Sequence, residues 1–164
     1  MNFTIRPIEP PDYDAVWQIF HSIVSQGETY AYAPDSSPQD AIHHWIEVPL
    51  ATYVAEQDGT ILGTYYLKPN QPGLGDHVAN CGYMVAAAAR GQGVATALCK
   101  HSQSEALRLG FWAIQFNFVV STNERAITLW QRLGFTIVGT IPKGFRHASK
   151  GLVDVYIMYK QLEQ

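Results

Sequence analysis

Hydrophobic residues recur along the chain with two different periods. After Pro11 they fall at Val16, Ile19, Phe20, Ile23 and Val24, which is the spacing of a helix with one buried face. Start and stop signals predict three more helices: from the Ser37 cap to before Pro49, from Gly93 to about Leu109, and from a Ser121 or Thr122 cap to Gly134. Short apolar runs predict strands over residues 3–8, 52–56, 61–67, 80–85, 113–120, 135–141 and 152–159.

The order of these elements indicates the fold class. Asp58-Gly59 between two strands is a strong hairpin signal, and strand–helix–strand units follow later in the chain. This order predicts an α/β fold, with a mixed sheet of about seven strands and about four helices on both faces. Within the strand at residues 80–85, alternation places Asn80, Gly82 and Met84 on one face of the sheet. The length of 164 residues suits one domain over residues 1–164.

Composition excludes several classes of protein. The chain is 47% hydrophobic and carries a net charge of −3, so we expect neither disorder nor a nucleic-acid partner. No apolar run is long enough to cross a bilayer, and the N-terminus has no signal-peptide pattern, so we expect no membrane partner and a cytoplasmic location. Cys81 and Cys99 form no C-x-x-C motif, and His43-His44 lack a third ligand, so no metal is expected.

The glycine-rich turn after Val85 carries the most specific chemistry. It reads Arg90-Gly91-Gln92-Gly93-Val94-Ala95-Thr96 and opens a helix. The first N–H groups of a helix lack internal partners, and glycines let an anion approach them. We therefore expect a diphosphate to rest on the N–H groups of residues 92–96, beside the cation of Arg90. A P-loop lysine and the third dinucleotide-motif glycine are absent, while a plain glycine turn remains an alternative.

Two segments resemble a known family. Arg90-x-x-Gly93-x-Ala95 is similar to the R/Q-x-x-G-x-G/A signature of the GNAT superfamily of acetyl-coenzyme A-dependent N-acetyltransferases. Downstream, the stretch from Val119 to Asn123, then Ala126, and then Leu129-Trp130-x-x-Leu133-Gly134-Phe135 resembles the strand, the Asn-led helix and the L-G-F ending of that family. In element order the resemblance extends from about Thr4 to Tyr159.

The resemblance implies an N-acetyltransferase with a centrally splayed sheet. The strands at 80–85 and 113–120 would separate, and the pantetheine arm of acetyl-coenzyme A would lie between them. Met84 and Val85 would offer backbone hydrogen bonds, with the Val85 N–H as oxyanion donor, and Asn123, Ala126 and Trp130 would flank the arm. An amine attacks the thioester carbon and the thiolate leaves. Many relatives carry a tyrosine at the position of Trp130, and its hydroxyl serves as general acid for the leaving thiolate. An indole N–H cannot serve as that acid, so Trp130 is expected to pack beside the cofactor.

The acceptor is predicted from polar residues beside this opening. Asn80 and Asn117 lie in otherwise apolar strands, where an amide needs a partner, and they could hold an acceptor or satisfy each other. With Lys68-Pro69-Asn70, these residues resemble the yeast-type acetyltransferases of proline analogues such as azetidine-2-carboxylate. That resemblance implies that Asn80 and Asn117 bind a small amino-acid-like amine and that Asn80 sets turnover. Glu28, Tyr30 and Tyr32 are further candidates for contact with the acceptor.

Several points stay open at this stage. His77 is a candidate base, although a solvated loop histidine is the simpler interpretation. Glu124 and Tyr156 are read as a first-turn charge and a packing residue. A non-catalytic acyl-coenzyme A-binding module and a protein or peptide N-acetyltransferase are the alternative functions. Exposed sheet edges often pair between copies, so a homodimer is an open expectation.

Overall fold

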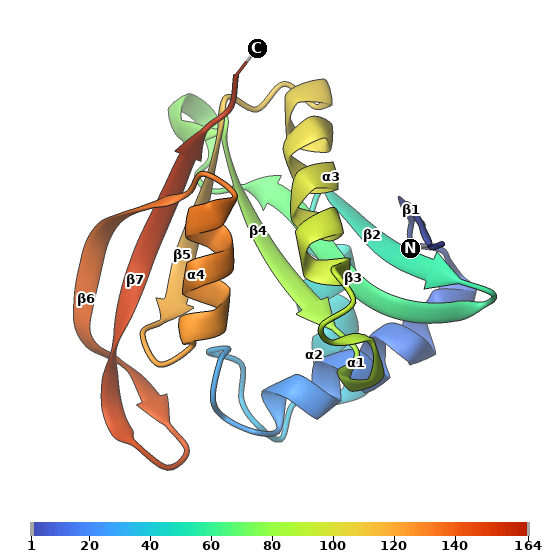
Figure 1. Ribbon diagram of the computed structural model, residues 1–164, viewed down its shortest axis with the longest axis horizontal. Helices are drawn as coiled ribbons and strands as arrows, with labels where there is room; N and C mark the ends of the chain where they lie inside the picture. Colours follow the sequence, from blue (N-terminus) through green and yellow to red (C-terminus); the bar gives the residue numbers. More distant parts are fainter. Residues whose placement is uncertain (1, 164) are drawn as a thin grey trace.

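The computed structural model describes residues 2–163, which form one seven-stranded sheet (Figure 1). The strand order is β1-β2-β3-β4-β5-β7-β6, and every neighbouring pair is antiparallel except β4 with β5. The strands are β1 (Thr4–Pro7), β2 (Ala51–Gln57), β3 (Thr60–Pro69), β4 (Val78–Val85), β5 (Ala113–Val120), β6 (Thr136–His147) and β7 (Gly151–Gln161).

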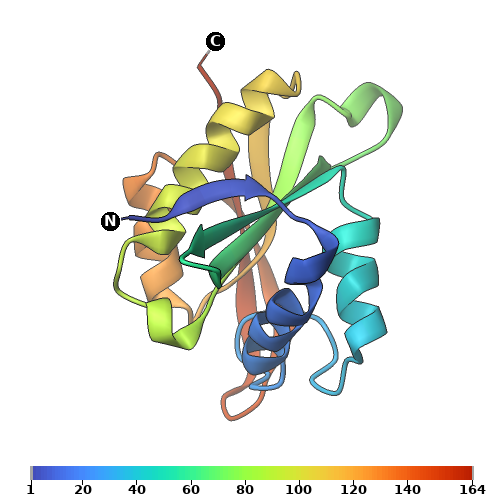
Figure 2. The same ribbon diagram turned by 90° about the vertical axis from the view of Figure 1, so that its right-hand side faces the viewer.

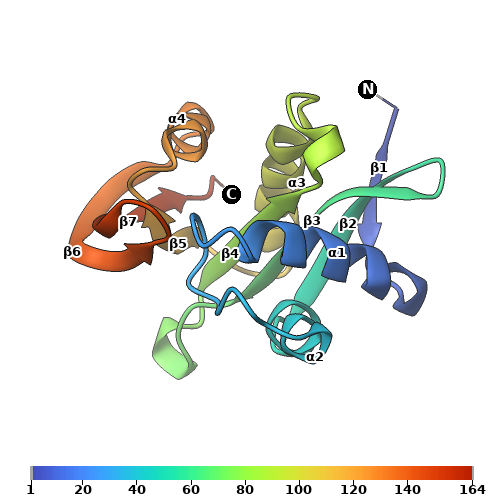
Figure 3. The same cartoon turned by 90° about the horizontal axis from the view of Figure 1, so that it is seen from below.

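Four α-helices cover the two faces of this sheet, which confirms the predicted fold class. They are α1 (Tyr13–Val24), α2 (Pro38–Ile42), α3 (Val94–Arg108) and α4 (Glu124–Arg132). Seen from the side and from below, α1 and α2 lie against one face, and α3 and α4 lie against the other (Figures 2 and 3). A loop of residues 25–37 joins α1 to α2 and, with the start of α4, frames the region between β4 and β5.

Each face of the sheet has its own hydrophobic core. Met84 of β4 packs with Phe20 of α1 and Trp45, whereas Cys81 and Tyr83 pack with residues of α3 and α4. The predicted alternation of side chains along β4 is therefore confirmed. β4 thus contributes side chains to both layers of the protein, as expected for a central strand.

The pairing between β4 and β5 is short. Only three pairs join them, Val78 with Ala113, Ala79 with Ile114 and Asn80 with Gln115. Beyond these pairs β5 contains a bulge between Phe116 and Val119, and the two strands diverge (Figure 1). A bulge bends its strand and re-aims its side chains. The remainder of β4, residues 81–85, therefore has no strand paired to its β5-facing edge, and this edge borders the gap between β4 and β5.

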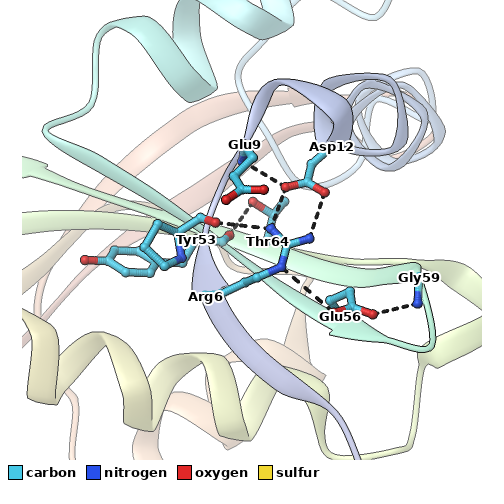
Figure 4. A network of polar contacts seen from close by, with 8 residues as sticks. Arg6, Glu9, Asp12, Tyr53, Glu56, Gly59 and Thr64 are labelled. Carbon is cyan, nitrogen blue, oxygen red and sulfur yellow. Dashed lines mark hydrogen bonds and ion pairs between the residues drawn. The ribbon is translucent and has the colours of Figure 1, made fainter.

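A compact ionic network fixes the start of α1. The guanidinium of Arg6 binds the Asp12 carboxylate through two hydrogen bonds of 2.7 and 2.9 Å (Figure 4). The same carboxylate accepts the backbone N–H of Glu9 at 2.9 Å, which caps a short 3-10 turn. Arg6 also lies 3.9 Å from Glu56 of β2. The network ties β1, β2 and the entry of α1 together and so orients the helix that leads into the 25–37 loop.

Several predicted boundaries were wrong. The cap of α4 is Asn123, whose side chain accepts from the Ala126 N–H, and not Ser121 or Thr122. The helix predicted from the Ser37 cap to before Pro49 is present over that length, although its α-helical part ends at Ile42 and His43–Glu47 form a π-helical turn. β6 runs on to His147, because a bulge around Lys143, at φ +52°, absorbs the break expected after residue 141. The hairpin turn at Asp58-Gly59 was predicted correctly, and both residues have the positive φ of a type I′ turn.

Candidate active site

A cavity of about 650 Å³ occupies the opening between β4 and β5. Its walls come from β4, β5, the start of α4 and the loop of residues 25–37. Most of the predicted site residues line it, namely Glu28, Tyr30, Tyr32, Asn80, Met84, Val85, Arg90, Asn117, Asn123, Ala126 and Trp130. Residues 91–96 do not line the cavity; they form the turn and first helical residues that follow Arg90.

The open edge of β4 presents alternate peptide groups to the cavity. The Val78 carbonyl and the Ala86 N–H both bond toward β3, so the even-numbered residues of β4 direct their backbone groups to that neighbour. Met84 therefore uses its N–H and C=O within the sheet and offers the cavity only a buried side chain. Val85 directs its backbone groups into the opening. Of the two residues predicted to offer backbone bonds, only Val85 is placed to do so.

The edge position at Tyr83 is already occupied. The Tyr30 hydroxyl, which comes from the loop of residues 25–37, donates to the Tyr83 carbonyl and accepts from the Tyr83 N–H at 3.1 Å. Burial raises the pKa of Tyr30 well above its usual range, so this hydroxyl stays protonated and keeps both bonds. Tyr30 therefore lines the cavity and is also bonded to the main chain of β4.

The turn before α3 has the backbone of an anion site. Gly91 and Gly93 adopt φ of +77° and +79°, and Gly93 is the N-cap of α3. A Cβ built on Gly91 would meet nothing within 4 Å, so the space above this turn is open. The Gln92 side chain donates to the Ala88 carbonyl at 3.0 Å, so it is engaged within the turn itself. Arg90 is exposed beside them.

Asn123, Ala126 and Trp130 form the α4 side of the cavity. The Asn123 carboxamide oxygen caps α4, which leaves its NH₂ group directed to other partners. Trp130 is only 9% exposed and lies 5.0 Å from the Tyr83 ring and 5.3 Å from the Phe116 ring. Its contacts are those of a packing residue, as predicted, with one edge on the cavity.

Asn80 is buried and held at both ends of its amide. Its oxygen accepts from the Tyr66 hydroxyl at 3.1 Å, and its NH₂ donates to the Gln115 carbonyl at 3.0 Å. An amide can make about four hydrogen bonds, so these two orient the group while leaving capacity for a ligand. Tyr66 reaches Asn80 across Gly82, where a Cβ would lie 2.7 Å from the Tyr66 ring.

Asn117 and Asn80 do not bond to each other, so the alternative in which the two amides satisfy one another was wrong. Asn117 is exposed on the bulge of β5, accepts from the Gln115 side chain at 2.9 Å and donates to Asn70 at 2.6 Å. The side-chain amides of Gln115, Asn117 and Asn70 are therefore linked in a chain, and Asn117 is the member that lines the cavity. The sequence alone marks Asn70 only as part of a motif and carries no sign that Tyr66 and Gln115 support the asparagines.

The charges around the cavity are sparse. Among its lining residues, Glu28 is the carboxylate, and Arg90 and Arg125 are the guanidinium groups. Burial raises the pKa of the Cys81 thiol and of the Tyr66 hydroxyl well above their usual ranges, so both are neutral at pH 7. The charged groups that line the cavity are therefore one carboxylate and two guanidinium groups, among neutral amides, phenols and a thiol.

The other candidate residues lie away from the cavity. His77 precedes β4 at its paired end, where its carbonyl accepts from Trp112, so it is not placed to act as the base. Glu124 is exposed and does not line the cavity, and Tyr156 packs against the core of the α3 and α4 face. Within residues 2–163 there is no group of three or more potential metal-ligating His, Cys, Asp or Glu residues. None of the helices within those residues combines the length and the hydrophobicity required of a membrane span.

Comparison with solved structures places this geometry in a known fold. A GCN5-related N-acetyltransferase from Kribbella flavida is 46% identical, with a TM-score of 0.92 over 98% of both chains. A phosphinothricin acetyltransferase from Sinorhizobium meliloti, solved with acetyl-coenzyme A, has the same fold at 18% identity, with a TM-score of 0.88 over 99% of this chain and 89% of the other.

Comparison at the level of sequence agrees. The N-acetyltransferase aca1 of Schizosaccharomyces pombe is 38% identical over 109 residues, which are 66% of this chain and 52% of that protein. The chain therefore spans about half the length of this curated relative. Residues 13–135 match the acetyltransferase (GNAT) family, and this match covers both motifs and the whole opening between β4 and β5. The chain belongs to the acetyltransferase (GNAT) family.

Proposed function

We propose that this protein transfers the acetyl group of acetyl-coenzyme A to the amine of a small molecule, with an amino acid or amino-acid analogue as the favoured acceptor. The observation that carries this proposal is the divergence of β4 and β5 after three residue pairs. It leaves the Val85 peptide on an open edge, between the start of α3 and a cavity lined by asparagines.

The residues present fit coenzyme A. The N–H groups of residues 92–96 suit a diphosphate, because the turn at Gly91 and Gly93 is bare and stands at the positive end of the α3 dipole. Arg90 adds a cation at the junction of turn and cavity. Val85 offers a peptide N–H and C=O to the arm, and Asn123 offers its NH₂ group. Bound there, acetyl-coenzyme A supplies an acetyl group on a thiolate leaving group.

The acceptor end supports an amine nucleophile. Glu28 would attract an ammonium group, and Asn80 and Asn117 would bond to the polar groups of an amino acid. The ammonium first gives one proton to Glu28 or to solvent water, and the neutral nitrogen then forms a bond to the acetyl carbon. As the carbon–sulfur bond breaks and the thiolate leaves, the nitrogen loses a second proton to solvent water. The Val85 N–H is the donor for the carbonyl oxygen, since the Tyr83 N–H is engaged by Tyr30.

Direct transfer is favoured over an acyl-enzyme. Cys81 of β4 lines the cavity, and its thiol is the side chain there that could act as a covalent nucleophile. Its burial raises the pKa of the thiol, and a protonated thiol is a poor nucleophile. The amine therefore attacks without a covalent intermediate on the protein.

Two measurements test the proposal. Isothermal titration calorimetry should show acetyl-coenzyme A binding at micromolar levels, and absence of binding would refute the coenzyme A site. Release of free thiol should then be followed across matched panels of amino acids, amino-acid analogues and peptides. Release with peptides alone would favour a peptide N-acetyltransferase, and binding without release would favour a non-catalytic acyl-coenzyme A-binding module.

Asn80→Ala separates the two ends of the site. We expect turnover with the best acceptor to fall by about tenfold or more, because Asn80 would orient the amine, while the acetyl-coenzyme A Kd stays within about twofold. Asn80→Asp, which keeps the shape of the side chain, is the matched variant. Unchanged turnover in Asn80→Ala would remove Asn80 from the acceptor site.

A further inference from the structure

Tyr30 closes the β4 edge at one position and leaves the next one open. Its hydroxyl is bonded to both main-chain groups of Tyr83, 53 residues further along the chain. Val85 is the next residue of β4 whose backbone faces the same opening. Two residues of an extended strand span about 7 Å. An acyl group held at Val85 therefore has a short, bounded space before it meets the Tyr30 hydroxyl.

The direction of approach makes this boundary relevant. The start of α3 lies beyond the Val85 end of β4, so a ligand arm that runs from the anion site along the strand reaches Val85 before Tyr83. An acyl group that extends past Val85 along the β4 edge therefore points toward Tyr83, whose main-chain groups are bonded to Tyr30. An acetyl group adds one carbon beyond the carbonyl, and each longer acyl chain adds another.

The hydroxyl is held firmly at this position. The Tyr30 ring stacks on Tyr32, with centroids 5.9 Å apart and planes 13° apart, and meets the edge of Trp45 at 6.0 Å. The 25–37 loop is anchored to the β6–β7 hairpin by the Ala148 N–H, which donates to the Gly27 carbonyl at 3.0 Å. The position of Tyr30 is thus fixed by ring contacts with Tyr32 and Trp45, by the anchored loop and by its hydrogen bonds to β4.

Displacement of the hydroxyl would leave polar groups without partners. Tyr83 is 9% exposed, and buried main-chain groups that lose a hydrogen bond are costly. A methyl or methylene group that enters this position cannot replace either bond. An acyl chain that needs the space must therefore bind against this cost.

We propose that Tyr30 determines acyl-chain length, so that acetyl-coenzyme A is accepted and propionyl- or butyryl-coenzyme A is excluded. The inference rests on the proposed function, because it assigns the acyl end of the same cavity. Tyr30 is a specificity-determining residue in this proposal. It is not the proton donor to the leaving thiolate, since its hydroxyl is already engaged with Tyr83.

Two variants of Tyr30 test the proposal. Tyr30→Phe keeps the stacked ring and removes only the hydroxyl oxygen. The Tyr83 N–H and C=O then have no hydrogen bond to Tyr30 that a longer acyl chain would break. Tyr30→Ala removes the ring as well and should admit butyryl-coenzyme A. Tyr32→Phe is the matched control, because it deletes the hydroxyl of the adjacent ring in the same cavity, and it should keep the wild-type acyl preference.

The readouts are the Kd of acetyl-, propionyl- and butyryl-coenzyme A by calorimetry and kcat/KM from thiol release with one amine. We expect the acetyl-to-propionyl ratio to fall by about tenfold or more in Tyr30→Phe, while the acetyl-coenzyme A Kd stays within about twofold. Thermal unfolding of each variant shows whether it is folded, and Tyr30→Phe keeps the test valid if Tyr30→Ala is unstable.

The outcomes separate the two proposals. A wild-type ratio in Tyr30→Phe that still binds acetyl-coenzyme A would overturn the role of Tyr30 and leave the proposed function intact. Tighter acetyl-coenzyme A binding in Tyr30→Phe, with no gain for propionyl-coenzyme A, would show that the acetyl group itself displaces the hydroxyl and would also overturn it. Failure of the wild-type protein to bind any acyl-coenzyme A would overturn both.

Discussion

The hydroxyl of Tyr66 on β3 donates to the side-chain oxygen of Asn80 on β4 across 3.1 Å. Gly82 is the residue of β4 directly opposite Tyr66, and it is the absence of a side chain there that lets the ring lie across the strand. With the Gln115 carbonyl of β5, which accepts from the Asn80 NH₂ group, the orientation of Asn80 is set by three residues on three strands. Because the amide is buried, the proposed contact with an acceptor depends on the direction in which its NH₂ and oxygen point.

Tyr66→Phe should weaken acceptor use without affecting the coenzyme A site. Loss of this hydrogen bond frees the Asn80 amide to rotate, and we expect kcat/KM for the acceptor to fall by about tenfold, which corresponds to one hydrogen bond. Steady-state kinetics and calorimetry with acetyl-coenzyme A measure the two effects. Tyr65→Phe is the control, because Tyr65 bonds His101 on the other face of the sheet. An equal loss in both variants would contradict this role.

Gly27→Ala should disturb the 25–37 loop. Gly27 has φ +66°, and its Cβ would lie 3.2 Å from the Ala148 Cβ. We expect a loss of about 1–2 kcal/mol in the free energy of unfolding and a several-fold higher KM for the acceptor. Gly59→Ala carries a similar φ penalty in open space, so it should lose stability with no change in KM. If KM is unchanged in Gly27→Ala, the hairpin contact does not position the loop.

Cys81→Ala should retain turnover within about fivefold. The raised pKa of the thiol leaves little thiolate at neutral pH, so removal of the sulfur changes packing more than chemistry. Thiol-release kinetics measure the rate, and intact-protein mass spectrometry after mixing with acetyl-coenzyme A looks for a covalent adduct. An adduct on Cys81 together with a hundredfold loss of rate would rule out direct transfer.

Acid should weaken the Arg6–Asp12 network. The hydrogen bonds from Arg6 lower the pKa of Asp12 in the folded protein, so the stabilisation is complete above the ordinary carboxyl pKa of about 3.9 and is lost as the pH falls through the lower folded pKa. Asp12→Asn should cost about 1–2 kcal/mol at pH 7. Urea unfolding should show a smaller stability difference between pH 6 and pH 3 in this variant than in the wild-type protein.

A second variant isolates the pair. Arg6→Gln removes the same hydrogen bonds from the other side, and the double variant should cost less than the two single losses added together. Full additivity would mean that the two residues contribute independently.

Local patterns predicted most of the fold. The apolar stripe of α1, the hairpin at Asp58-Gly59 and the Gly93 start of α3 depend on residues close in sequence, and each was predicted correctly. The end of β6 was missed, because Pro142 and Gly144 indicate a break by local rules and only pairing with β7 shows that a bulge accommodates them. The Asn123 cap was missed since Ser121 and Thr122 are equally good caps on paper.

The site was predicted less completely. Asn80, Asn117 and Arg90 were selected from their strand and turn contexts and Val85 from the family resemblance, and all four line one cavity. The bond from Tyr30 to Tyr83 could not have been foreseen, because it joins an irregular loop to a strand edge and leaves no periodic signal. The roles of the site residues, the cytoplasmic location and the homodimer remain predictions.

The elements of the proposed site lie on opposite faces of the sheet. The α3 start lies on one face, and the 25–37 loop with Asn80 lies toward the other. The nucleotide end of a cosubstrate and an incoming amine would therefore travel by different routes, and neither would obstruct the passage of the other. We expect the acetylated product to depart while coenzyme A is still in place, so that exchange at one mouth is independent of exchange at the other.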